Sequence, residues 1–327
     1  DGLFDSQFGQ QVNQIGFIQN FPNMGITKAN NKLQNEIADQ SSYSMQISIN
    51  ELKWKVRQNY LDIQYQKELE KLYGMLTNTY SEYYDKALVR VKTGATNAIE
   101  ALTLKSKWKE YDLLQRQAQI EITNLNNQFQ LLLNSGTGVT TMDSLLAYSL
   151  SSPLDNTRNI FLLQSKQSIA VETAKIEVMQ SATKPGFNIG YALQNYQQGG
   201  WFNSAQIGIS IPLFNGQVKK HIEAQKMQVE IVNFQYESKR LALNQELSNV
   251  NNIMNIYKEG IDFYKEQLQT IHPEMLRISN LNYQAGELSY LELLTTLQLM
   301  AANNKNYWDQ IIAYNKAAAN YQFLTNQ

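Results

Sequence analysis

The residues of this chain that could bind a metal are few and scattered. The sequence contains no cysteine and two histidines, His221 and His272, which lie far apart. Nine methionines could supply thioether ligands for Cu(I) or Ag(I), but they are dispersed along the chain, and methionine more often fills a hydrophobic core. We therefore expect no metal site, no bound cofactor and no disulfide framework.

The acidic and hydroxyl residues show none of the spacings typical of catalytic sites. No Gly-rich phosphate-binding loop follows a predicted strand, no carboxylates are spaced to form a pocket, and no serine or lysine has an activating neighbour. The formal net charge is −1, which gives little attraction for a polyanion such as nucleic acid. We therefore expect neither an enzyme nor a nucleic-acid-binding protein.

One short motif that contains a carboxylate occurs twice. The pattern Gly-x4-Ile/Leu-Glu-x-Leu starts at Gly94 and again at Gly286, and it places glutamates at Glu100 and Glu292. A glycine after a long helical pattern predicts a turn, because glycine adopts the left-handed backbone conformation without steric strain. Glu292 could equally be a solvated helix carboxylate, as most exposed glutamates are.

The motif belongs to a longer internal repeat. Gly94 and Gly286 lie 192 residues apart (286 − 94), while Pro22 and Pro212 lie 190 residues apart (212 − 22). Each proline separates an alternating segment from a helical one. Because two independent landmarks share nearly one offset, we predict a tandem duplication of a strand, a long helix, a tight turn and a returning helix. This unit is too long for a TPR or HEAT solenoid.

The elements that must position these motifs are long helices. From Ile26 to Tyr84 the sequence has no proline and a single glycine, Gly74, which predicts a helix of about 60 residues. A second long helix is predicted from residue 216 to about residue 283, with Pro273 as its one kink. Three further helices are predicted. The first restarts within Lys92–Trp108 and stops at Asn134, Ser135 and Gly136. The second covers residues 154–183, and the third runs from the second turn to Phe323.

Three short segments alternate between apolar and small polar residues, the pattern of strands. An ordinary half-buried sheet also alternates in this way. Two features favour outer-membrane strands around a water-filled lumen: each strand has about ten residues with aromatic residues near its ends, and the polar face is uncharged. The predicted lipid-facing residues are Phe187, Ile189, Tyr191, Leu193, Ile207, Ile209 and Ile211, with Tyr196, Trp201 and Phe202 at the membrane interface.

Three strands cannot close a membrane sheet. An open edge in lipid would leave backbone hydrogen-bonding groups unsatisfied. We therefore expect the sheet to close with other copies of the chain.

Several stretches together resemble one protein family. The strand that leads into IPLFNGQVKKHIEAQ, the turn YQAGELSYLELLTTLQ and the duplicated unit are similar to the outer membrane efflux proteins, the TolC-like channels, over essentially the whole chain. DSQFGQQVNQIGFIQNFPNMGITKANNKL and YDKALVRVKTGATNAIEALTLKSKW most resemble the TolC-like component, or fused domain, of Cus/Czc-type heavy-metal resistance-nodulation-division (RND) pumps.

The resemblance implies a mostly α fold with a small β part. Family members are trimers in which four strands per protomer build one outer-membrane β-barrel that continues into a long α-helical barrel. Residues 1–136 would be the first repeat, truncated at its start, residues 137–153 a connecting, equatorial-like segment, and residues 154–327 the second repeat, with its strand pair at 186–213. Because the family's first helix and strand do not precede Asp1, we expect the natural chain to extend upstream, as a signal peptide with a lipid anchor or as a fused pump.

The function implied by the resemblance is passive export. The protein would be the exit duct of a tripartite efflux system, located in the bacterial outer membrane and extending into the periplasm. It would conduct substrate from the inner membrane, heavy-metal cations in the Cus/Czc-type systems. Its expected partners are two further copies of itself, a periplasmic adaptor (membrane fusion) protein, an inner-membrane RND transporter, separate or fused, and outer-membrane lipid.

The resemblance also assigns roles at the two turns. Glu292 matches an acidic position at the tunnel constriction, where three copies would form a cation-selective ring and raise one another's pKa. Tyr283 matches a position that holds this constriction closed, and the second acid of that gate falls on Thr295. The turns would be the tips that dock the adaptor, through Thr93, Gly94, Ala95, Ala285, Gly286 and Glu287.

A second class of function fits the same helices. A periplasmic coiled-coil tether or scaffold, with the strands as a small cap sheet, also needs long helices with apolar residues at i, i+3 and i+4. Extraction only with detergent would favour the duct, whereas a freely soluble monomer would favour the tether.

Overall fold

A computed structural model describes residues 12–21, 23–136, 144–148, 159–196, 200–212 and 215–326 of the chain. Pro22 and most of the predicted connecting segment lie outside these residues. The chain forms two compact units, one from residues 1–46 and 160–241 and the other from residues 47–159 and 242–327. Each unit combines residues from both predicted repeats.

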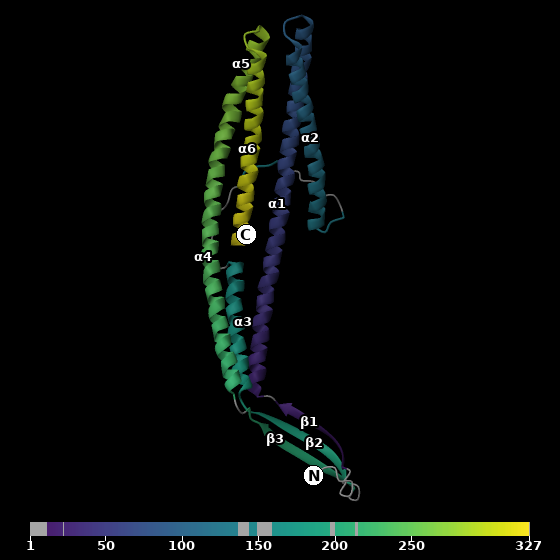
Figure 1. Ribbon diagram of the computed structural model, residues 1–327, viewed down its shortest axis with the longest axis vertical. Helices are drawn as coiled ribbons and strands as arrows, with labels where there is room; N and C mark the ends of the chain where they lie inside the picture. The colour runs from purple at the N-terminus through teal and green to yellow at the C-terminus, as the bar shows by residue number, and fades with distance from the viewer. Residues whose placement is uncertain are drawn as a thin grey trace. The chain divides into compact units, whose positions relative to one another are not determined.

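The first unit contains an antiparallel three-stranded sheet (Figure 1). The strands β1 (Val12–Phe21), β2 (Gly186–Tyr196) and β3 (Gly200–Ser210) lie side by side in the order β1-β2-β3. The three strands predicted from the alternating segments are therefore confirmed. Within the described sheet, β1 and β3 each pair along one edge only, so backbone groups on their outer edges have no partner strand.

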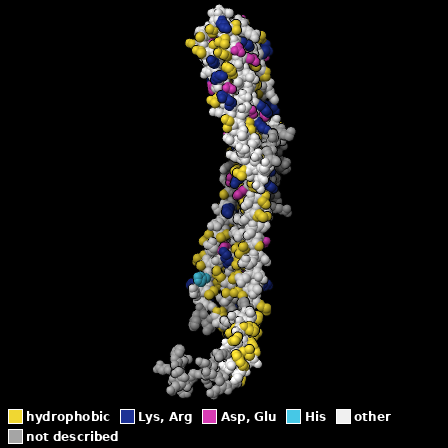
Figure 2. Space-filling view, turned by 90° about the vertical axis from the view of Figure 1, so that its right-hand side faces the viewer, with side chains coloured by type: hydrophobic (Ala, Val, Ile, Leu, Met, Phe, Trp, Pro, Cys, Tyr) yellow, Lys and Arg dark blue, Asp and Glu magenta, His cyan; other side chains and the backbone are white. Residues whose placement is uncertain are grey.

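The strand register places apolar residues of all three strands on one face. Phe187 pairs with Phe21 on one side and with Ile209 on the other. Directly paired residues of an antiparallel sheet share a face, and the Phe21 and Phe187 rings stack with their centroids 5.0 Å apart. Figure 2 shows hydrophobic side chains gathered over this sheet. The opposite face carries mostly small and uncharged polar residues, together with Ile18 of β1 and Phe202 of β3.

Polar contacts join the helices of the first unit. α3 (Ile160–Ala182) lies against the beginnings of α1 (Met24–Lys92) and α4 (Gly216–Glu266). The Gln40 amide donates to the Ser168 hydroxyl over 2.9 Å, and the Gln225 amide donates to the Glu172 carboxylate over 2.6 Å. These amide contacts explain why the sequence is rich in uncharged polar residues where helices meet.

The second unit is built from long helices (Figure 1). It contains the rest of α1 and α4 together with α2 (Ala98–Leu132), α5 (His272–Ala285) and α6 (Tyr290–Thr325). α1 has 69 residues and extends beyond the predicted helix at both ends, because packing as well as local propensity decides where a helix ends. Gly74 in its middle has a packing role, since an added Cβ would lie 2.9 Å from the Gln115 amide nitrogen on α2.

The second long helix is interrupted at the predicted place. A π-helical turn, η2 (Gln267–Ile271), separates α4 from α5, and Pro273 follows it in the first turn of α5. Proline lacks an N–H and its ring clashes with the carbonyl four residues earlier. The wider π turn accommodates this break in the hydrogen-bond ladder.

The main hydrophobic core of the second unit is shared by four helices. Residues of α1, α2, α5 and α6 contribute to one buried cluster. Leu145, from the segment 144–148, belongs to a second buried cluster. No helix in the described part of the chain has a segment apolar and long enough to cross a membrane. The central members of the main cluster are Leu72, Leu76, Tyr80, Leu104, Leu293 and Leu297.

The two hairpin turns have the same backbone geometry, as the duplication predicts. Gly94 and Gly286 have φ values of 71° and 77°, in the left-handed region where glycine is favoured. The N–H of the next residue donates back to Arg90 over 2.9 Å in one turn and to Asn282 over 2.8 Å in the other. This is the Schellman pattern that ends a helix. α2 ends with the same pattern, since the Ser135 N–H donates to the Gln130 carbonyl over 3.0 Å, but its left-handed residue is Asn134, with φ 49°.

We predict that Gly286→Ala lowers the free energy of unfolding by roughly 1–2 kcal/mol, because a side chain is strained in the left-handed conformation. An added Cβ meets no atom within 4 Å, so the loss arises from the backbone alone. Gly216→Ala is the matched control, since its added Cβ is equally free and its φ is not positive. Urea unfolding followed by far-UV circular dichroism measures both, and equal losses would contradict the prediction.

Candidate functional site

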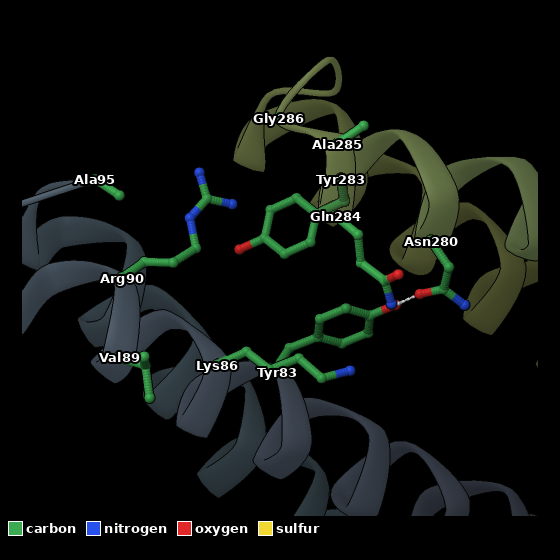
Figure 3. Close-up of a pocket in the computed structure, with 10 residues that line it drawn as sticks. All are labelled: Tyr83, Lys86, Val89, Arg90, Ala95, Asn280, Tyr283, Gln284, Ala285 and Gly286. Carbon is green, nitrogen blue, oxygen red and sulfur yellow. Dashed lines mark hydrogen bonds between the residues drawn. The ribbon is translucent and has the colours of Figure 1, made fainter. Parts of the chain in front are cut away.

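The candidate site lies where the two hairpin tips of the second unit meet. The last turns of α1 and α5 line a cavity of about 490 Å³ (Figure 3). Tyr83, Lys86, Val89, Arg90 and Ala95 come from the first hairpin. The second hairpin contributes Asn280, Tyr283, Gln284, Ala285 and Gly286.

Tyr283 joins the two hairpins through a buried hydrogen bond. Its hydroxyl donates to the Glu100 carboxylate at the start of α2, and the two residues are 5% and 3% exposed. Burial, reinforced by the bond to Glu100, raises the pKa of Tyr283 to about 12. The phenol therefore stays protonated, and able to donate, at neutral pH.

The environment of Glu100 explains how a carboxylate can be buried here. Its side chain also accepts a hydrogen bond from the Thr96 hydroxyl. Glu100 lies in the first turn of α2, where Asn97 caps the helix by accepting from the backbone N–H groups of Ile99 and Glu100. The positive end of the helix dipole favours a carboxylate at this position. Two hydroxyl donors and the helix start thus replace water around the charge.

A second contact crosses between the hairpins beside the first. The Tyr83 hydroxyl of α1 donates to the side-chain oxygen of Asn280 on α5 (Figure 3). The Tyr83 and Tyr283 rings meet edge to face with centroids 6.1 Å apart. Arg90 lies over the Tyr283 ring at 4.6 Å, and Lys86 lies over the Tyr83 ring at 5.1 Å. The paired tyrosines therefore hold the tips together, with a cation over each ring.

Glu292, the predicted constriction carboxylate, has a different environment from its repeat mate Glu100. It is exposed and forms a capping box with Ser289, whose backbone N–H donates to its carboxylate over 2.9 Å. Hydrogen bonds from the Ser289 hydroxyl and backbone hold the pKa of Glu292 below its usual range. Glu292 is therefore an exposed, ionised carboxylate at the start of α6.

The structure does not bring the three predicted gate residues into one contact set. Thr295 is exposed, and its hydroxyl donates to the Leu291 carbonyl over 2.8 Å. Among the described residues, neither Thr295 nor Glu292 forms a side-chain hydrogen bond with Tyr283, which bonds to Glu100 instead. Sequence reasoning gave Glu100 no role. The pattern Ser-x-x-Glu at 289–292 is a capping-box signature that could have identified the role of Glu292 in its helix.

The predicted docking residues are exposed at the tips. Both tip glycines and the residues flanking them are open to solvent, and no atom lies within 4 Å of a Cβ added at Gly94 or Gly286. Another chain could therefore approach the backbone of either turn closely. The exposed flanking residues are Thr93, Ala95, Ala285 and Glu287.

The predicted lipid-facing residues share one face of the sheet in the first unit. Ile207 and Ile209 are 82% and 72% exposed, and β1 adds Ile15 and Phe17 to the same face. Ile211 lies just beyond the end of β3. The predicted β2 members of the face are Phe187, Ile189, Tyr191 and Leu193, all partly exposed.

The opposite face of the sheet is hollowed and polar. It lines a cavity of about 510 Å³ that includes Gln14, Gly16, Gly190, Gln194 and Gln206. Strand alternation places Phe202 on this face and Trp201 on the apolar face. That both lie at the membrane interface stays a prediction. The side chain of Tyr196 lies outside the described residues.

No group of three or more His, Asp or Glu side chains in the described ranges is arranged to hold a metal ion. His272 is 4% exposed, and burial lowers its pKa. Its ring nitrogen Nε2 lies 3.2 Å from the Asn303 amide. This histidine is a hydrogen-bonded core residue beside the π turn.

Comparison with known proteins identifies the fold. The family model for outer membrane efflux proteins matches residues 154–326. A solved structure of CusC, described by its transmembrane channel formation, is 16% identical with a TM-score of 0.81, over 97% of this chain and 83% of CusC.

Two further solved structures share the fold. The CmeC outer membrane channel of Campylobacter jejuni is 11% identical with a TM-score of 0.78, over 98% of this chain and 78% of CmeC. The open MtrE outer membrane channel of Neisseria gonorrhoeae is 15% identical with a TM-score of 0.74, over 97% and 80%. No curated protein sequence matches the chain.

We predict that Tyr283→Phe lowers the free energy of unfolding by about 1.5–3 kcal/mol, because the lost hydrogen bond reaches a buried carboxylate. Tyr83→Phe is the matched control. It removes an equivalent hydroxyl from the same interface, but its acceptor Asn280 is neutral, so the loss should be about 0.5–1.5 kcal/mol. Urea unfolding of the full chain measures both variants. A larger loss for Tyr83→Phe would show that Glu100 is not held by Tyr283.

Proposed function

The chain belongs to the outer membrane efflux protein family, and we propose that it is the outer-membrane exit duct of a tripartite efflux system. In this role it passively conducts substrate from an inner-membrane RND pump and a periplasmic adaptor across the periplasm and the outer membrane. Members of the family are channels rather than enzymes, and the solved structures with this fold include named outer membrane channels.

The observation that carries the proposal is the sheet of the first unit. One face presents exposed Ile15, Phe17, Ile207 and Ile209, while the other is hollowed and lined mostly by small or uncharged polar residues, with Ile18 as an apolar member. Such a sheet suits lipid on one side and water on the other. The free edges of β1 and β3 support closure with two further protomers into one barrel, as the family resemblance implies.

The duct would open and close at the hairpin tips of the second unit. We assign the closed state to the bond between Tyr283 and Glu100, which holds the second hairpin against the first. The adaptor would bind the exposed turns at Gly94 and Gly286 and shift this contact. In the trimer Glu292 would line the constriction as a ring of three carboxylates, with Thr295 one turn further along α6.

We propose heavy-metal cations as the cargo. The support is the similarity of the segments around residues 5–33 and 84–108 to the TolC-like part of Cus/Czc-type pumps. A ring of exposed, ionised Glu292 side chains would favour cations at the constriction. The predicted absence of a resident metal site fits a duct that makes few specific contacts with what passes through.

The lipid-facing assignment predicts the effect of charge on the sheet. Ile207→Arg should block assembly into membranes, because arginine at the bilayer midplane costs roughly 2–4 kcal/mol per site, and three protomers would each contribute. Gln206→Arg, the adjacent residue on the hollowed face, is the matched control and should assemble normally. Detergent-dependent extraction and native electrophoresis of the trimer measure both. A soluble monomer, or damage only from Gln206→Arg, would refute the assignment.

The two repeat-mate glutamates should have separable effects on conductance in planar bilayers. Glu100→Gln weakens the bond from Tyr283 and should raise the conductance of the isolated trimer. Glu292→Gln should lower cation selectivity and leave the closed-state conductance unchanged, because its contacts are confined to the start of α6. Unchanged conductance in Glu100→Gln would show that the bond between Tyr283 and Glu100 does not hold the channel closed.

A further inference from the structure

We propose that Lys86 and Arg90 form an anion-binding pair that receives a carboxylate side chain of the adaptor, and that this contact loosens the bond between Tyr283 and Glu100. The inference rests on the proposed function, because it names the chemistry of the partner at the tips. It assigns the adaptor an acidic residue that enters the cavity between the hairpins.

The cavity already has the shape and the donors for a carboxylate. Lys86 and Arg90 line it from α1, and the Asn280 and Gln284 amides line it from α5 (Figure 3). Its remaining lining includes the apolar side chains of Val89, Ala95 and Ala285. At about 490 Å³ the space admits a side chain from another protein, and apolar walls strengthen a charge pair formed within them.

Within the described part of the chain, neither cation has a carboxylate partner. Among the ion pairs of the described residues none includes Lys86 or Arg90. Each instead lies over a tyrosine ring, Lys86 over Tyr83 and Arg90 over Tyr283. Cation–π contacts contribute less than a charge-assisted bidentate bond between arginine and a carboxylate. An incoming carboxylate would therefore be preferred.

The charge of the two tips is unequal, which gives a second and independent observation. Residues 86–109 carry six Lys or Arg and one Glu (6 − 1 = +5), whereas the repeat-matched residues 278–301 carry two Glu and no Lys or Arg (0 − 2 = −2). When the preceding turn of each hairpin is included, the net charge is +3 (6 − 3) for residues 82–109 and −2 (1 − 3) for residues 274–301. Figure 2 shows Lys and Arg side chains gathered at this end of the unit.

This asymmetry indicates which side of the cavity attracts the partner. The sequence predicts that the two hairpins are repeats of one unit, so equal tips would be expected if both met the same surface. The positive potential comes from the α1–α2 hairpin, and of its lysines Lys107 is paired with Glu110. A carboxylate on the adaptor would be drawn to the α1 side of the cavity, where Arg90 and Lys86 lie, and electrostatic attraction would raise its association rate.

Binding at this place would act directly on the closed contact. Arg90 lies over the ring whose hydroxyl donates to Glu100. A bound carboxylate would neutralise Arg90 and bring a second negative charge toward Glu100. Like charges that approach each other repel, so the hydrogen bond from Tyr283 would weaken. Adaptor binding would thus be linked to release of the second hairpin.

The test uses the full-length trimer and the purified adaptor protein of the pump with which it is expressed. Lys86→Gln and Arg90→Gln should each weaken adaptor binding about tenfold, because each loses a charge-assisted hydrogen bond to the adaptor carboxylate. Lys92→Gln, an exposed lysine on the same helix end outside the cavity, is the matched control and should bind normally. Affinity is measured by biolayer interferometry at several salt concentrations, and the unaltered trimer should show the steepest loss with salt.

A charge-swap experiment identifies the partner group. In cells that carry the whole pump, Arg90→Glu should reduce efflux, and selection for restored efflux should yield Asp or Glu changed to Lys or Arg in the adaptor. Suppressors confined to this chain would overturn the inference. It would also be overturned if all three glutamine variants weakened adaptor binding equally, or if none of them weakened it. If the unaltered trimer bound no adaptor, or if deletion of the gene left efflux intact, the proposed function would fail as well.

Discussion

A carboxylate buried in protein must be surrounded by hydrogen-bond donors, and Glu100 obtains one of its donors from a distant part of the chain. The start of α2 and the Thr96 hydroxyl provide part of its environment, and the Tyr283 hydroxyl provides the rest. Separation of the hairpins would leave this charge partly unsatisfied, which costs more than an ordinary surface hydrogen bond. The packing of the two tips therefore depends on this bond, and the tyrosines around it exclude the water that would otherwise replace it.

The two hairpins share their backbone geometry and differ in their side chains. Both turns end their first helix with a left-handed glycine and begin the next with a polar cap, Asn97 or Ser289. Yet Glu100 is buried against the other hairpin, and Glu292 is exposed and bonded to its own cap. Backbone geometry follows from local sequence, whereas the environment of a side chain depends on what the fold places opposite it.

The same division appears in the sheet of the first unit. Alternation along each strand separates an apolar face from a polar one, and the register of β2 with β1 and β3 aligns these faces across the sheet. Gly16 and Gly190 keep the polar face hollow, since an added Cβ at Gly16 would lie 2.6 Å from the Ala192 side chain. Small residues are therefore required there by the approach of neighbouring strands.

The sequence by itself determined the elements of this protein. Proline-free stretches, the break at Pro273, the two turn glycines and the alternating strands all act over a few residues, and the structure has them where they were predicted. The extent of α1 was underestimated, because helix ends depend on packing as well as local propensity. Only the tertiary structure decided that Tyr283 bonds to Glu100 rather than joining Glu292 and Thr295, and that Arg90 faces an open cavity. Those contacts join residues nearly two hundred positions apart, and no local pattern specifies which helix faces will meet.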